Sequence, residues 1–110
     1  MKSEILYLGH IRDAISKING YIAGIDYDKF ASNDMVVDAV VRELEIIGEA
    51  CSNLNVDFRQ KHEEIPFRDI IDMRNVLIHQ YAGVNTKVVW DTCKEDLPPL
   101  RDFVVKLLKE

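Results

Sequence analysis

Residues 66–83 read PFRDIIDMRNVLIHQYAG, and the rest of the chain is organised around this segment. It starts with Pro66, which suits the first position of a helix, and ends with Gly83, which suits the position after the last turn. At about 100° per residue, its apolar side chains share one face with an arginine. The apolar residues are Phe67, Ile70, Ile71, Leu77, Ile78 and Tyr81, and the arginine is Arg74. The sequence therefore predicts an amphipathic helix with a guanidinium in its apolar stripe.

The position of Arg74 has three explanations. Because a guanidinium stays charged, it could pair with a buried carboxylate from another helix, and the candidates are Glu43, Glu45 and Glu49. It could instead extend to solvent at the edge of the domain, or line a cleft where it meets an anion such as phosphate. The opposite arc of the same helix is polar and carries Arg68, Asp72, Asn75 and His79. This combination suits a functional site better than it suits packing.

The spacing of Arg74 and His79 also bears on assembly. The two residues are five apart, so they diverge by about 140° on a straight helix. One copy could bring both to a single substrate only if the arginine bends or the helix unwinds near His79. Two copies could instead pool these residues in one groove, and we therefore expect a homodimer with two-fold symmetry.

Length and composition predict one globular domain over residues 1–110. Contents of 47% hydrophobic and 30% charged residues are ordinary for a soluble protein, and we expect a cytoplasmic one because neither a signal peptide nor a membrane span is evident. Cys51 and Cys93 lack metal-ligand spacing and are interpreted as buried free thiols. The net charge of −5 argues mildly against a protein that binds nucleic acid by itself.

The first half of the chain has helical periodicity. A first helix is expected from Ser3, as its N-cap, to about Ala23, followed by a connector over residues 25–33 with one short turn. Its inward stripe consists of Leu8, Ile11, Ile15, Ile18 and Ile22. A second helix is expected over residues 34–59, then a polar linker over residues 60–65. The second helix is apolar over more than half its girth, which predicts neighbours on two sides. Its main stripe consists of Val37, Val40, Leu44, Ile47, Cys51 and Leu54.

The C-terminal part is also predicted to be helical. Asn85 can cap a fourth helix, which Pro98 and Pro99 should break or kink because proline costs about 3 kcal/mol inside a helix. Asp96 could then cap a fifth. The inward residues are Val89, Trp90, Cys93, Leu97, Leu100, Phe103, Val104, Leu107 and Leu108. No strand pattern competes, so the predicted fold class is all-α, an antiparallel bundle of about four to five helices.

Several kinds of catalytic motif are absent from the sequence. It contains no glycine-rich phosphate loop, no H-E-x-x-H, no paired-cysteine metal site and no nucleophile elbow. His10 and His62 have no partner that the sequence suggests, and both are interpreted as surface or packing residues. The candidates that remain lie in one segment, and they are Arg74, Asn75, His79 and Tyr81.

The segment RNVLIHQY (Arg74–Tyr81) matches the R-x4-H-x-Y motif of the HepT-like toxins, within the HEPN superfamily of small helical ribonucleases. Other blocks resemble that family in its order and cover essentially the whole chain: RELEIIGEA (42–50), EIPFRDII (64–71), YAGV (81–84) and VWDT…DLP (89–98). Phe67 stands where the family commonly has tryptophan, a difference that concerns packing.

The resemblance implies a metal-independent endoribonuclease without a cofactor, active as a homodimer and toxic until neutralised. The family's antitoxin is a small MntA-like nucleotidyltransferase that transfers AMP from ATP to the tyrosine of the motif. By position, Arg74 and His79 would be catalytic, Tyr81 would accept AMP, and Asn75 would have a supporting role.

Two other classes of function remain open from the sequence. The chain could be a non-catalytic nucleotide- or partner-binding subunit of a minimal nucleotidyltransferase, which the acidic net charge favours and the intact Arg74/His79 pair disfavours. It could also be a purely structural helical dimer with Arg74 in a buried ion pair.

Overall fold

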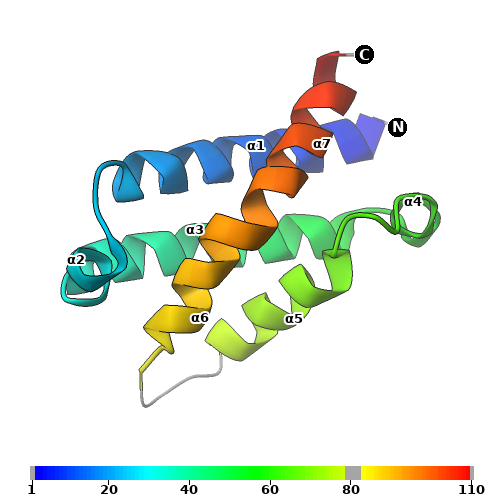
Figure 1. Ribbon diagram of the computed structural model, residues 1–110. Helices are drawn as coiled ribbons and strands as arrows, with labels where there is room; N and C mark the ends of the chain where they lie inside the picture. The colour runs from blue at the N-terminus through cyan, green and yellow to red at the C-terminus, as the bar shows by residue number, and fades with distance from the viewer. Residues whose placement is uncertain (1, 79–82, 110) are drawn as a thin grey trace.

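The computed structural model describes residues 2–78 and 83–109, and every regular element in these ranges is helical. In chain order the elements are α1 (Lys2–Ile22), α2 (Tyr27–Ala31), α3 (Asp34–Asn53), α4 (Val56–Lys61), α5 (Phe67–Ile78), α6 (Thr86–Asp91), the π-helical segment η1 (Thr92–Asp96) and α7 (Leu97–Lys109). In Figure 1, α3 lies between α1 and α5, and α7 packs against α1. The predicted all-α bundle is confirmed.

Helix α1 buries the stripe that its sequence predicts. Leu8, Ile11, Ile15, Ile18 and Ile22 are all buried. Ser3 does not cap the helix as predicted, because it lies inside α1, where its Oγ donates to Glu4 Oε2 at 3.0 Å. The helix ends within one residue of the predicted position, and Gly24 follows with φ of +77°, a conformation that favours glycine.

Helix α3 is the central element of the bundle. Its predicted stripe is buried at every position, Val37, Val40, Leu44, Ile47, Cys51 and Leu54, and it contacts α1 on one side and α5 on the other. The approach of α5 is closest at Gly48, where an added Cβ would lie 2.2 Å from Arg74 Cβ. The two helices can therefore pack at this distance only because residue 48 has no side chain.

The predicted helix over residues 34–59 is wrong at its C-terminal end. Helix α3 stops at Asn53, and the Leu54 backbone is extended. Asn55 then caps α4, because its side-chain Oδ1 accepts from the backbone N–H of Asp57 at 2.8 Å. The Asn55 cap thus starts a new helix, α4, although the apolar pattern of α3 continues through this position. The predicted linker is correspondingly shorter, since α4 continues to Lys61.

Pro98 and Pro99 were predicted to break or kink the helix, and they do not break it, because the helical backbone continues from α6 through η1 into α7 (Figure 1). The Leu97 N–H donates to the Thr92 carbonyl, five residues earlier. This wider turn lets the backbone realign before the prolines, which then occupy the first turn of α7, where a missing N–H is tolerated. The predicted cap Asp96 lies inside η1. Among the predicted inward residues, Val89, Cys93, Leu97, Leu100 and Val104 are buried, and Trp90, Phe103, Leu107 and Leu108 are half-buried against the core.

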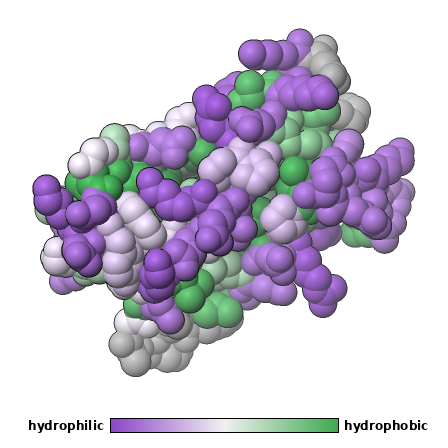
Figure 2. All heavy atoms as spheres, in the orientation of Figure 1, coloured by the Kyte–Doolittle hydropathy of each residue, from purple (hydrophilic) through white to green (hydrophobic). Residues whose placement is uncertain are grey.

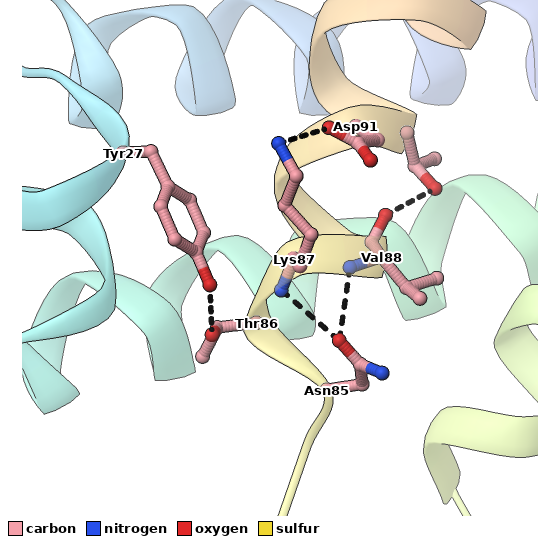
Figure 3. Close-up of polar contacts among 7 residues, drawn as sticks. Tyr27, Asn85, Thr86, Lys87, Val88 and Asp91 are labelled. Carbon is pink, nitrogen blue, oxygen red and sulfur yellow. Dashed lines mark hydrogen bonds and ion pairs between the residues drawn. The ribbon is translucent and has the colours of Figure 1, made fainter.

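Polar contacts fix the start of α6 against α2 (Figure 3). Asn85 caps α6 as predicted, since its Oδ1 accepts from the backbone N–H groups of Lys87 and Val88 at 3.1 and 3.2 Å. The hydroxyl oxygens of Tyr27 and Thr86 lie 2.9 Å apart and join the two helices. These contacts hold the chain directly after the part that bears the predicted motif.

The surface seen in Figure 2 is mainly hydrophilic, and its apolar residues lie in separate patches. Within residues 2–78 and 83–109, no helix has both the length and the apolar character needed to cross a membrane.

Candidate active site

A groove of about 450 Å³ lies over α3, between α1 and α5. One face of α3 lines it at intervals of three or four residues, with Arg42, then Glu45 and Ile46, then Glu49 and Ala50, and then Asn53. Helix α1 contributes Tyr7 and His10, and α5 contributes Arg74 and Ile78. Three helices that are separate in the sequence therefore bring two arginines, two glutamates and a histidine to one open site.

Arg74 is held in this groove by two hydrogen bonds. Its Nη2 donates to Glu49 Oε2 at 2.5 Å, and its Nη1 donates to Asn75 Oδ1 at 2.7 Å. The side chains of Arg74 and Glu49 are 28% and 54% exposed. The structure thus combines two of the predicted explanations, because Arg74 pairs with a carboxylate of another helix and also lines an open groove. The pair is not buried, so a purely structural buried ion pair does not describe this site.

The guanidinium retains donors for an anion. Arginine carries five N–H donors in a planar fork, and the contacts with Glu49 and Asn75 engage two of them. A guanidinium can bind two oxygens of a phosphate with parallel hydrogen bonds. Because the pair with Glu49 is open to solvent, a phosphate can compete with that carboxylate for Arg74.

The structure places the predicted site residues as follows. Arg74 lines the groove and donates a hydrogen bond to Asn75. His79 and Tyr81 lie outside the described residues. Ile78, the residue before His79 in the chain, also lines the groove and is 44% exposed. The apolar face that Ile78 shares with Arg74 thus borders the open groove at the end of α5.

Among the groove residues that sequence reasoning did not place in a site are a second arginine, Arg42, and a histidine, His10. Arg42 lies seven residues before Glu49, so helical spacing alone places both on one face of α3. His10 is exposed and lines the groove beside Tyr7, whose ring centroid is 6.1 Å away. No local pattern could have found His10, because its position depends on how α1 packs against α3.

Other candidate groups lie away from this groove. His62 packs against the rings of Phe58 and Phe103, each with a centroid separation of 4.8 Å, so its predicted packing role is confirmed. Cys51 and Cys93 are buried free thiols as predicted, and burial raises the pKa of each to about 12. Both thiols therefore stay protonated at neutral pH and are poor nucleophiles. Within the described ranges, no three His, Cys, Asp or Glu side chains are grouped to hold a metal ion.

The fold and the groove define a small helical protein with an arginine in an open site. The family comparison specifies the class further: a family model described as "Ribonuclease HepT-like" matches residues 11–107. The chain belongs to this HepT-like ribonuclease family, which confirms the resemblance noted in the sequence.

Individual relatives agree with this assignment. The chain is 44% identical over 103 residues to the "Probable ribonuclease HepT" of Thermococcus cleftensis, and the match covers 94% of each chain. It is 38% identical over 110 residues to a "Putative RNase" of Caldanaerobacter subterraneus subsp. tengcongensis, covering all of this chain and 98% of the relative. The match to a "Gamma-glutamylcyclotransferase and putative RNase" of Methanocaldococcus jannaschii, also 38% identical, covers only 50% of that longer protein. No solved structure matches the chain.

Proposed function

We propose that this protein is a metal-independent endoribonuclease, the toxin of a toxin–antitoxin pair, which cuts RNA with Arg74 and His79. One observation carries the proposal: Arg74 stands in an open groove whose α5 wall leads directly to His79 in the chain. Membership of a ribonuclease family supports RNA as the anion that meets Arg74.

The chemistry needs no cofactor because RNA carries its own nucleophile. The 2′-oxygen attacks the neighbouring phosphorus and gives up its proton, while the bond from phosphorus to the 5′-oxygen breaks and that oxygen gains a proton. His79, with a reference pKa near 6.5, would serve as general acid or base, which is typically worth about 10²–10⁴-fold. Arg74 would stabilise the negative charge that develops on the phosphate oxygens.

The proposed active form is a homodimer. Since Arg74 and His79 diverge by about 140° on a straight helix, two copies that pack around α5 can pool these residues in one composite groove. Asn75 supports the site by accepting a hydrogen bond from the Arg74 guanidinium at 2.7 Å.

The proposed regulation acts on Tyr81. A MntA-like nucleotidyltransferase antitoxin would transfer AMP from ATP to its hydroxyl, two residues after His79. The added phosphate brings bulk and negative charge close to the RNA site, so it blocks substrate sterically and by repulsion.

The test is RNA cleavage in EDTA by purified protein that mass spectrometry shows to be free of AMP on Tyr81. We expect wild type to cut RNA and both Arg74→Ala and His79→Ala to lose cleavage. Arg101→Ala is the matched control, because Arg101 is an exposed arginine of α7 that lines a different pocket. Intact RNA with unmodified wild type, over several RNA pools, would contradict the proposal.

A second candidate function is a non-catalytic nucleotide- or partner-binding subunit of a minimal nucleotidyltransferase. It is favoured by the net charge of −5 and by the two glutamates that face the groove, Glu45 and Glu49. A protein that accepts AMP on Tyr81 but leaves RNA intact when unmodified would support this function instead.

A further inference from the structure

The groove contains a second arginine that the proposed chemistry does not use. Arg42 lies on the same face of α3 as Glu49, the partner of Arg74, and lines the same groove. Seven residues on a helix amount to two turns, so the two positions are about 10 Å apart along α3.

The two arginines differ in their contacts. Arg74 is engaged by Glu49 and Asn75. Arg42 is exposed, and in the part of the chain that the structure describes it has no ion pair or side-chain hydrogen bond. A guanidinium that faces a groove without a carboxylate partner is available to an anion from solution.

The direction of the helices places Arg42 at one end of the groove. Helix α5 runs antiparallel to α3 in Figure 1, and the Arg74 stem meets α3 at Gly48. One turn later along α5, Ile78 has moved toward the N-terminal part of α3, which is the part that holds Arg42. Arg42 therefore lies toward the end of the groove where α5 leads to His79.

We propose that Arg42 binds a phosphate of the same strand beyond the scissile one, so that the groove takes an RNA strand of several nucleotides along α3. Charges of one strand follow each other at about 3.4 Å along the axis of a duplex, so a separation of about 10 Å between the two positions spans more than one nucleotide step. Tyr7 and His10 offer aromatic rings on the α1 wall, on which an intervening base can stack. This inference rests on the proposed ribonuclease function.

Because of the charges in the groove, we expect the affinity for RNA to depend on the length of the strand. Two arginines face two glutamates, Glu45 and Glu49, so the lining has no formal net charge apart from His10. A ligand with a single phosphate can use only the cation that it contacts, whereas a longer strand reaches both. The site is therefore expected to prefer oligonucleotides over dinucleotides.

The test measures binding of 2′-O-methyl RNA, whose blocked 2′-oxygen prevents cleavage, by fluorescence anisotropy at several salt concentrations. The ligands are a dinucleotide with one phosphate and a hexanucleotide, and the proteins are wild type, Arg42→Gln, Arg42→Lys and Arg101→Gln. Arg101 is the matched control because it is exposed on α7 and lines a different pocket. All variants are checked for wild-type helical content by circular dichroism.

We expect Arg42→Gln to weaken hexanucleotide binding about tenfold, as for one lost charged hydrogen-bond contact, and to lower the salt slope by about 0.7. Arg42→Lys should retain the wild-type salt slope. Arg101→Gln should bind the hexanucleotide as wild type does, and Arg42→Gln should bind the dinucleotide with unchanged affinity. Unchanged hexanucleotide binding by Arg42→Gln, or equal weakening of both ligands, would overturn the inference. If wild type cuts no RNA but these binding differences appear, the ribonuclease proposal fails and the strand-binding role of Arg42 stands.

Discussion

Two neighbouring residues of α3 contact the same arginine in opposite ways. Gly48 is buried against the stem of Arg74, and an added Cβ would lie 2.2 Å from Arg74 Cβ. Glu49 is 54% exposed and binds the guanidinium at 2.5 Å. The close contact at Gly48 leaves no space for a larger side chain, whereas the exposed guanidinium of Arg74 can exchange Glu49 for another anion. Helix α3 therefore fixes where Arg74 stands without fixing what its guanidinium binds.

The largest expected effect is that of Arg74→Met, which removes the guanidinium and keeps an unbranched aliphatic side chain. RNA cleavage should fall about 10²–10³-fold, as for loss of one group that stabilises transition-state charge. The free energy of unfolding should change by less than about 1 kcal/mol, because the lost ion pair is largely open to solvent. Single-turnover cleavage and urea denaturation measure the two quantities. Full cleavage by a folded Arg74→Met protein would remove Arg74 from the chemistry.

The second expected effect concerns the stem, in Gly48→Ala. The new methyl group would force α3 and α5 apart, and overpacking of this kind costs about 1–3 kcal/mol. This loss should exceed the gain of about 0.5–1 kcal/mol that alanine brings to a helix. Thermal unfolding should show a melting temperature several degrees lower.

Gly20→Ala is the matched control for Gly48→Ala. Gly20 is an exposed residue of α1, and an added Cβ there meets nothing within 4 Å. Alanine should therefore raise the free energy of unfolding by up to about 1 kcal/mol at this position. If both substitutions stabilised the protein equally, the close approach at Gly48 would not limit the packing of α5.

The parts of the fold that were predicted correctly depend on local periodicity. The stripes of α1 and α3 repeat at helical spacing, and burial follows that spacing directly. The same reasoning singled out Arg74 as a charged residue at an apolar position, and Arg74 lines the groove. A charged residue at an apolar position is a local signal, so no knowledge of the packing was needed.

The errors arose where hydrogen bonds override periodicity. Asn55 ends a periodic segment because its side chain caps α4, and the π segment η1 carries the helix across Pro98. Neither event changes the apolar pattern, so the pattern could not reveal them. The groove could not be predicted for a different reason, which is tertiary packing. His10 and Arg42 share a site with Arg74 only because α1, α3 and α5 pack in one particular register.

The smallest expected effect is that of Glu49→Gln, which keeps the shape of the head contact and removes its charge. Exposed ion pairs are worth about 0.2–1 kcal/mol, so the free energy of unfolding should fall by no more than that. Binding of the 2′-O-methyl hexanucleotide should tighten about twofold to fivefold, because phosphate no longer displaces a carboxylate from Arg74. Glu45→Gln is the control, since Glu45 lines the groove but is not the carboxylate paired with Arg74. Its substitution changes the groove charge equally and should tighten binding less. Weaker binding by Glu49→Gln would mean that the carboxylate braces the guanidinium for RNA instead of competing with it.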